Sequence, residues 1–286
     1  MRGARRFAAL EASVATNVAP AAGETLVAAT SGGPDSVALA ALLAPATRTT
    51  GATLVLAHVN AALRPSSWQD EAVVLSVGAT LGVRVVTMSL GPGRGDEARL
   101  RDERYAALAA AARAIGATRV LTAHHAADQT ETVFLALLRG AGPEGLVGMA
   151  PERQLAPGLR LVRPLLGHEP AVLAAYAATQ HLPYAVDPTN ADHSYRRNAV
   201  RAALAQLRES FPHLDAAVAR CAGIARGERA GESRAAARAR LRDAVAAATG
   251  DVRDLTYERL DAAARALERG TPGRHFLRRG VEIIVE

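Results

Sequence analysis

Short hydrophobic runs alternate with longer amphipathic segments along the first half of the chain. Four runs have the length and composition of strands, at residues 25–29, 53–59, 83–90 and 119–123. Segments of helical composition follow them, at residues 35–43, 68–81, 97–115 and 128–139. Strands that alternate with helices of this length pair in parallel, because each helix returns the chain to the same edge of the sheet. The pattern therefore predicts an α/β domain with a parallel, Rossmann-like sheet.

The pattern changes beyond residue 140. A glycine-rich connector at 140–148 leads to an extended segment at 159–166, and helical segments follow at 169–180 and 194–207. From Pro212 the chain is rich in alanine and arginine, and it is predicted to be helical with breaks near Gly227 and Gly231. A last apolar run at 281–285 predicts a terminal strand. We therefore expect a mostly helical C-terminal region.

Composition narrows the class of protein. Of the 286 residues, 49% are hydrophobic and 22% are charged, which is typical of a globular protein. The apolar runs are far shorter than the ~20 residues of a membrane helix, and no apolar stretch follows the basic residues 1–6. The one cysteine, Cys221, excludes an internal disulfide and a multi-cysteine metal site, and we expect it to be a buried, inert residue. We expect a cytoplasmic protein without a membrane segment, and the sequence leaves its oligomeric state open.

The basic residues are unusual because all 34 of them are arginine and none is lysine. This excludes mechanisms that need a protein lysine, such as a Schiff base or the lysine of a Walker A loop. Eleven arginines and four acidic residues lie between Arg196 and Arg242, so this segment carries a formal charge of +7 in a chain of net charge +6. Such a segment is either a nucleic-acid surface or a solvated helical face. Only Tyr195 and Phe211 could stack on bases there.

The strongest local signal is a hexapeptide between the first strand and the first helix. Its residues are Ser31, Gly32, Gly33, Pro34, Asp35 and Ser36. Two glycines allow a close backbone approach to an anion, and the helix that follows offers free amides and the positive end of its dipole. Asp35 would repel a phosphate unless a magnesium ion bridges the two. The alternative is an ordinary turn with a capped helix, but the strand before and the helix after favour a nucleotide loop.

A second set of candidate groups follows the fourth strand. Asp128 and Glu131 are three residues apart on one helix face, at the sheet edge where ligands of α/β proteins bind. Paired acids there could hold magnesium, take a proton or bind an amine; the alternative is a solvated first turn. Arg197 and Arg201 are four residues apart, which suits phosphate contacts or a surface pair. For His124 and His125 a structural or nucleotide-contacting role is favoured over metal binding.

The hexapeptide resembles the SGGxDS signature of the PP-loop ATP-pyrophosphatase superfamily, whose members cleave ATP between the α and β phosphates. Further segments resemble the tRNA(Ile)-lysidine synthetase family in order and spacing. They are LAHVNAALR at 56–64, EAR at 97–99 with RY at 104–105, TAHHAADQTET at 122–132, RPLL at 163–166, DPTN at 187–190 and YRRN at 195–198. The resemblance covers about residues 24 to 215.

The resemblance implies an activity and a set of roles. The family uses ATP and Mg²⁺ to adenylate the 2-oxygen of the wobble cytidine of tRNA(Ile) with a CAU anticodon, and L-lysine then displaces AMP to form lysidine. The loop 31–36 and His58 would bind ATP, and Asp35 would hold Mg²⁺. Asp35, Asp128, Glu131 and Arg197 would be catalytic. Residues implied to contact substrate or tRNA are Arg64, Arg139, Asn198 and Arg201.

The resemblance also implies a division of the chain into domains. Residues 1–210 would form the catalytic domain, with an extension at 1–23, a nucleotide core at 24–140 and a substrate-contacting part at 141–210. Residues 211–286 would form a reduced, arginine-rich helical module, where many members of the family carry further C-terminal domains that hold the tRNA body.

Two departures from the family pattern bear on activity. Ala61 and Ala62 stand where the family has His-Gly, and Ala127 stands where it has the first acid of a pair. A non-catalytic tRNA-binding relative is therefore one alternative. A tRNA thiolase is another, although thiolases that act on cytidine generally need several cysteines. A synthetase of the GMP or NAD type would explain the loop but not the basic segment.

Overall fold

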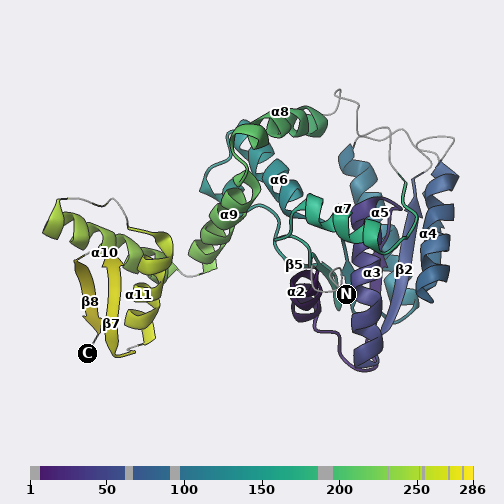
Figure 1. Ribbon diagram of the computed structural model, residues 1–286, viewed down its shortest axis with the longest axis horizontal. Coiled ribbons are helices and arrows are strands. Elements are labelled where there is room, and N and C mark those ends of the chain that lie inside the picture. Colours follow the sequence, from purple (N-terminus) through teal and green to yellow (C-terminus); the bar gives the residue numbers. More distant parts are fainter. Residues whose placement is uncertain are drawn as a thin grey trace. The chain divides into compact units, whose positions relative to one another are not determined.

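The computed structural model describes residues 7–61, 67–90, 97–185, 196–230, 232–250, 252, 255–269, 271–278 and 280–285. The chain forms two compact units, Met1–Arg220 and Cys221–Glu286, which are described separately below (Figure 1). The division lies ten residues beyond the domain boundary expected from the sequence. The functional division at residue 210 stays a prediction.

The first unit is built on a six-stranded sheet in the order β3-β2-β1-β4-β6-β5. Its strands are β1 (Thr25–Ala29), β2 (Thr53–Asn60), β3 (Arg84–Ser89), β4 (Arg119–Leu121), β5 (Glu152–Ala156) and β6 (Leu159–Val162). All neighbours pair in parallel except β5, which runs antiparallel to β6 at one edge. The parallel α/β architecture expected from the sequence is confirmed. The edge strand β5 was not expected, because its residues are mostly polar and exposed.

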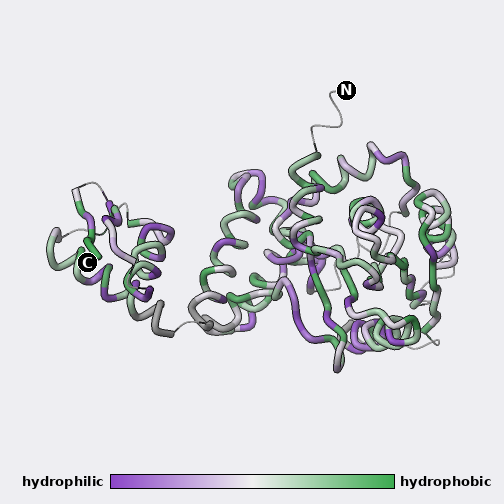
Figure 2. The backbone as a smooth tube through the Cα atoms, turned by 90° about the horizontal axis from the view of Figure 1, so that it is seen from below, coloured by the Kyte–Doolittle hydropathy of each residue, from purple (hydrophilic) through white to green (hydrophobic). Residues whose placement is uncertain are grey.

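Helices cover both faces of this sheet (Figure 1). The side chains of β1 alternate between the faces, so that Leu26 and Ala28 join one buried cluster and Val27 joins the other. The first cluster includes residues of α2 (Ala8–Val18), α3 (Pro34–Thr50), α4 (Ser67–Leu81) and α7 (Pro170–Thr179). The second includes residues of α5 (Glu97–Ala114). Figure 2 shows green and purple alternating along the helix turns, as expected where one side of a helix is buried.

The order of the strands fixes where a ligand can bind. From β1 the chain moves outward through β2 and β3, and it then returns to place β4 on the other side of β1. The loops that leave the carboxyl ends of β1 and β4 therefore diverge, and an α/β sheet has its binding crevice at such a point. At the opposite edge, Gly51, Gly82 and Gly116 adopt positive φ at or beyond the ends of α3, α4 and α5, each shortly before the next strand.

Four further elements complete the part of the first unit that carries the site. They are α6 (Ala126–Leu138), the 3₁₀ helix η1 (Pro143–Val147), α8 (Arg196–Ser210) and α9 (Leu214–Ala230). α6 packs against both η1 and α8. α9 begins in the first unit, continues through Gly227 and ends in the second unit. The sequence-based expectation for Cys221 is wrong: Cys221 is exposed, because its neighbour Ala222 occupies the buried side of α9.

The second unit contains α10 (Glu232–Thr249), α11 (Tyr257–Arg269) and a hairpin of β7 (Gly273–Arg278) and β8 (Val281–Val285). Val245, Leu260, Ala263 and Leu277 form its small core. The predicted terminal strand is thus confirmed, whereas its partner β7 was not expected. Among the described residues of the whole chain, no helix is both long and apolar enough to span a membrane.

Candidate nucleotide and acid–arginine site

The loop after β1 is closed by its two serines. The Ser31 amide donates a hydrogen bond of 3.2 Å to Oγ of Ser36, and the Ser36 hydroxyl donates one of 2.8 Å to the carbonyl of Gly33. The Gly33 amide in turn donates to Oγ of Ser31 at 3.3 Å. These bonds hold the backbone in a compact turn directly before α3, so the two hydroxyls shape the loop as well as lining it.

The start of α3 suits an anion. Gly33 is the N-cap, and it has no side chain with which to accept from the first amides of the helix. Gly32 adopts a φ of +92°, and a Cβ there would lie 3.1 Å from the carbonyl oxygen of Asp70 in α4. A side chain at position 32 would therefore be strained and crowded. The Ser-Gly-Gly sequence thus allows close packing of the loop against α4 and leaves the first turn of α3 without a side-chain cap.

His58 presents a buried acceptor or donor beside this loop. Its ring is 4% exposed on β2, and its Nδ1 lies 2.9 Å from the carbonyl oxygen of Thr30. Because a carbonyl only accepts, Nδ1 carries the proton, and a neutral ring then leaves Nε2 as an acceptor. Nε2 is buried and has no hydrogen-bond partner among the residues that the structure describes. An unsatisfied polar atom at this depth fits a ligand that supplies a hydroxyl or amino group.

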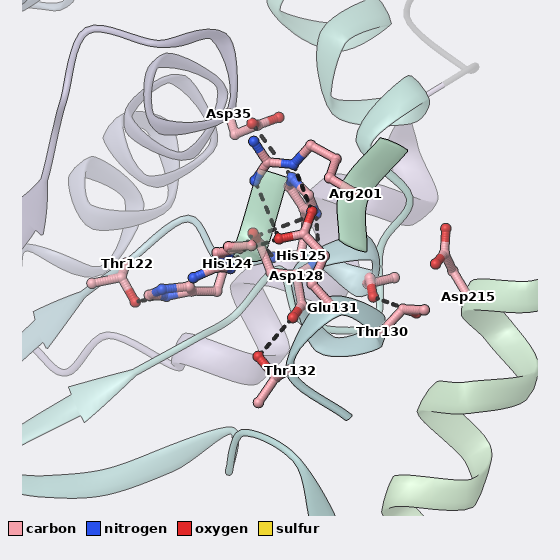
Figure 3. Close-up of polar contacts among 12 residues, drawn as sticks. Asp35, Thr122, His124, His125, Asp128, Thr130, Glu131, Thr132, Arg201 and Asp215 are labelled. Atoms are coloured by element: carbon pink, nitrogen blue, oxygen red, sulfur yellow. Dashed lines mark hydrogen bonds and ion pairs between the residues drawn. The ribbon is translucent and has the colours of Figure 1, made fainter. Parts of the chain in front are cut away.

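His125 connects the two candidate regions of the site (Figure 3). It is the N-cap of α6, and its Nε2 lies 3.5 Å from Oδ2 of Asp35 while its Nδ1 lies 3.4 Å from Oδ2 of Asp128. The backbone amide of His125 donates to the same Asp128 oxygen at 3.0 Å. Burial alone would lower the pKa of His125, but Asp35, Asp128 and Glu131 outweigh burial and raise it. The carboxylates of the loop and of α6 therefore share one imidazole.

Glu131 lies one turn further along α6 and is 2% exposed. Nε of Arg197 donates to it at 2.7 Å, and Arg201 donates from Nε at 2.7 Å and from a terminal nitrogen at 3.2 Å. Arg197 also donates to Oδ1 of Asp128 at 3.0 Å. Burial would raise the pKa of Glu131, but the two guanidinium groups outweigh burial and lower it. This acid–arginine cluster, Asp128, Glu131, Arg197 and Arg201, joins α6 to α8 (Figure 3).

His124 faces a different environment from His125. Its Nδ1 lies 2.8 Å from the hydroxyl of Thr122. Burial lowers the pKa of His124 to about 4; Asp128 opposes this shift, and the cations of Arg163, Arg101 and Arg197 add to it. His124 is therefore neutral at pH 7. It can position a neighbour or accept a proton only weakly.

Two buried contacts fix the elements that carry these groups. Gln129, 1% exposed on α6, exchanges two hydrogen bonds with the backbone of Met149, at 2.7 and 3.2 Å. Arg208 and Asp215 form a two-bond ion pair, with both distances 2.9 Å, between α8 and the start of α9. Burial would raise the pKa of Asp215, but hydrogen bonds from Arg208 and Thr130 lower it. Both contacts were missed from the sequence, because in each one the partners lie in different segments, and their spacing matches no single helix or strand.

The structure brings most of the sequence-predicted residues together. The loop 31–36 and His58 lie at the carboxyl ends of β1 and β2, and Asp128, Glu131, Arg197 and Arg201 form the cluster described above. Asn198 is half-buried on α8. Arg139 is the exposed C-cap of α6, roughly 16 Å along the helix from Asp128. Arg64 lies outside the described residues.

The donor set at the loop fits magnesium bound together with ATP. Magnesium takes oxygen ligands and usually keeps waters, using one or two carboxylates together with substrate phosphates. Asp35 offers a partly exposed carboxylate in the first turn of α3, within the loop 31–36. Within the described residues no group of three His, Cys, Asp or Glu side chains forms a closed metal cage.

Comparison with known proteins identifies the family of this chain. The family model ATP_bind_3, a PP-loop domain, matches residues 7–208. Proteins named tRNA(Ile)-lysidine synthase are similar in sequence: 40% identical over 77% of this chain in Ralstonia nicotianae, 38% over 72% in Gloeobacter violaceus and 44% over 68% in Bordetella pertussis. The aligned region spans only 47%, 64% and 63% of those proteins.

A solved structure shares the fold. It is the U34-tRNA thiolase NcsA from Methanococcus maripaludis with its 4Fe-4S cluster. The TM-score is 0.65 at 15% sequence identity, over 74% of this chain and 77% of that one. At 15% sequence identity this similarity is evidence for the fold of the present chain alone.

Proposed function

Because this chain belongs to the PP-loop domain family, we propose that it ligates L-lysine to carbon 2 of the wobble cytidine of tRNA(Ile) with a CAU anticodon, at the expense of ATP. The names of the curated relatives support this substrate and product. The observation that carries the proposal is the position of His125, which contacts Asp35 of the nucleotide loop and Asp128 of the acid–arginine cluster. A nucleotide phosphate and an amine substrate could therefore occupy one continuous site.

In the first step the 2-oxygen of cytosine would attack the α-phosphorus of ATP. A bond forms between this oxygen and phosphorus, and pyrophosphate leaves. The amides of the loop 31–36 and the start of α3 would hold the phosphates, and Nε2 of His58 would accept a hydrogen bond from the nucleotide. Asp35 would hold Mg²⁺, which supplies charge neutralisation for the phosphates when bound.

In the second step the amine of L-lysine would attack carbon 2. The new carbon–nitrogen bond replaces the carbon–oxygen bond, and AMP leaves with the oxygen. The amine must first lose a proton, and Asp128 would orient the amine and assist that loss. Arg197 and Arg201 are both held by Glu131. They would contact the lysine carboxylate or a tRNA phosphate, because guanidinium groups match the oxygens of both anions.

The tRNA would meet the basic residues between Arg196 and Arg242, together with Arg64, Arg139 and Asn198. Binding through phosphates releases counterions, so the affinity for tRNA should fall steeply as salt rises. An affinity that stays constant between low and moderate salt would contradict this part of the proposal.

The test incubates the protein with ATP, Mg²⁺, labelled L-lysine and unmodified tRNA(Ile) with a CAU anticodon. Label should enter the tRNA, and AMP and pyrophosphate should appear only when tRNA is present. Asp35→Ala should abolish both signals, whereas Glu11→Ala, which removes an exposed acid on α2, should leave them unchanged. Incorporation by the unaltered chain would also mean that Ala61 and Ala127 are tolerated in place of the family's residues.

Other outcomes point to other functions. Binding of tRNA without lysine incorporation would indicate a non-catalytic relative, and Ala61→His with Ala127→Asp would then be assayed for recovery. Adenylation of tRNA that is followed by transfer of sulfur from a supplied donor would indicate a thiolase. The single cysteine argues against that second activity, because protein-held iron–sulfur clusters usually take several cysteine ligands.

A further inference from the structure

Three arginines from separate elements surround Tyr105 on α5. The guanidinium carbons of Arg101 and Arg153 lie 5.4 and 5.2 Å from the centroid of the Tyr105 ring. Arg101 also donates to the Tyr105 hydroxyl at 3.4 Å. Arg163, directly after β6, donates at 2.6 Å to the carbonyl of Ala150 and interacts electrostatically with Tyr105. We refer to Arg101, Arg153 and Arg163 as the Tyr105 arginine cluster.

The charge of this cluster is not balanced by acids. In the described part of the chain, none of its members forms an ion pair, and the nearby acids Glu103 and Glu152 pair instead with Arg99 and Arg160. Arg163 is 4% exposed, and its Nε is buried without a hydrogen-bond partner in the described ranges of the chain. Burial lowers the pKa of Arg163, and the cations of Arg153 and Arg101 add to this effect while Tyr105 opposes it. Clustered cations with a buried, unsatisfied donor indicate a place for an anion.

The cluster lies at the same edge of the sheet as the candidate site. It lies on the side of β4 that faces away from the nucleotide loop. Arg163 follows β6, His124 follows the adjacent β4, and the loop 31–36 follows β1 on the other side of β4. Neighbouring strands are about 4.8 Å apart, so Arg163 is roughly 10 Å across the sheet from the loop. Arg163 and Arg101 are both close enough to His124 to depress its pKa. An anion here would therefore lie beside the acid–arginine cluster, across β4 from the loop.

We propose that the Tyr105 arginine cluster binds a phosphate group of the RNA substrate next to the nucleotide that reacts. This inference rests on the proposed function. Arginine presents paired donors that match phosphate oxygens, and Arg153 is exposed while Arg101 is half-buried, so both can be reached by a ligand. A phosphodiester and the polyphosphate of ATP offer the same chemistry. The position across β4 from the loop and His58 favours the phosphodiester.

The experiment compares Arg101→Gln, Arg153→Gln and the double variant with Arg160→Gln. Arg160 is a matched control, because it is an exposed arginine on β6 whose partner is Glu152. Dissociation constants for tRNA and for a non-hydrolysable ATP analogue are measured across a series of salt concentrations, with circular dichroism to verify folding. Each cluster variant should weaken tRNA binding about tenfold at low salt. Because one single-strand phosphate contributes about 0.7 to the slope of log K against log salt, the double variant should reduce this slope by roughly 0.7, and Arg160→Gln should change it little.

Two results would overturn the proposal. In the first, the double variant has the same affinity for tRNA and the same salt slope as the Arg160→Gln control. The other is a loss of affinity for the ATP analogue with tRNA binding intact, which would assign the cluster to the nucleotide. Neither measurement needs lysine transfer. A protein that transfers no lysine but shows the expected slopes would refute the proposed function and retain the phosphate site.

Discussion

Arg197 on α8 donates a hydrogen bond of 2.7 Å from Nε to Oε2 of Glu131 on α6, across 66 positions of the sequence. Glu131→Gln removes the charge that this guanidinium and Arg201 share. We expect a loss of roughly 1–3 kcal/mol in the free energy of unfolding, moderated because both arginines are partly exposed. Lysine incorporation should fall further than stability does, because both guanidinium groups lose their orientation. Urea unfolding and the incorporation assay measure the two effects.

The control for Glu131→Gln is Glu152→Gln. Glu152 forms an exposed pair with Arg160 at 2.8 Å, and such pairs contribute about 0–1 kcal/mol. Equal unfolding free energies for the two variants would show that the buried cluster does not hold α6 to α8.

Asp35 should control the protonation of His125. Asp35→Asn removes a carboxylate 3.5 Å from Nε2 of His125, so the pKa of His125 should fall relative to the unaltered protein. NMR titration of the imidazole without Mg²⁺ measures this shift. His168 serves as an internal reference, because its pKa is lowered by burial and its ring contacts Ser13. An unchanged His125 titration would mean that the Asp35 contact is not formed in solution.

Glu24 should make stability depend on pH. A hydrogen bond from Arg119 is the largest cause that lowers the pKa of Glu24 from 4.5 to about 2. A carboxyl with a depressed pKa stabilises the folded state fully above pH 4.5 and loses this contribution as the pH falls towards 2. Glu24→Gln should therefore cost roughly 2 kcal/mol at pH 7 and about half of that or less at pH 3. Urea unfolding at both pH values tests this prediction. A difference in unfolding free energy between the variant and the unaltered protein that is the same at both pH values would refute it.

Gln129 should stabilise the backbone beside the site. Gln129→Ala removes both hydrogen bonds to Met149 and leaves two buried backbone groups unpaired. We expect a loss of about 1–3 kcal/mol, measured by chemical unfolding. Gln154→Ala, at an exposed position of β5, is the matched control and should stay within ~0.5 kcal/mol of the unaltered chain. If the two variants are equally stable, water replaces the side chain without cost.

The sheet could be predicted because its strands are short, apolar and separated by amphipathic helices. The first strand has the predicted bounds, 25–29, and the last strand has the predicted bounds, 281–285. β5 and β7 were missed because edge strands with one solvated face carry polar residues such as Glu152 and Arg274 and give a weak hydrophobic signal. The helix after the loop extends to Thr50, past Pro45, because proline weakens a helix without always ending it.

The site was only partly predictable, for a different reason. The loop 31–36 is contiguous, so the sequence alone indicates its chemistry. The spacing of Asp128 and Glu131 indicated paired acids on one face, but it could not indicate that Glu131 is neutralised by two arginines of α8. The Tyr105 arginine cluster gave no signal, because its members are 52 and 10 positions apart and meet only through the sheet.

The left-handed turns at Gly51, Gly82 and Gly116 all lie at the sheet edge opposite the site. The distance between Asp35 and Asp128 is set by the adjacent strands β1 and β4. The length of the connections at the opposite edge of the sheet does not affect this distance. New termini or an inserted reporter peptide at such a turn should leave the relative positions of the site residues unchanged. The protein thus offers positions for fluorophores or split halves through which substrate binding could be followed without touching the reacting groups.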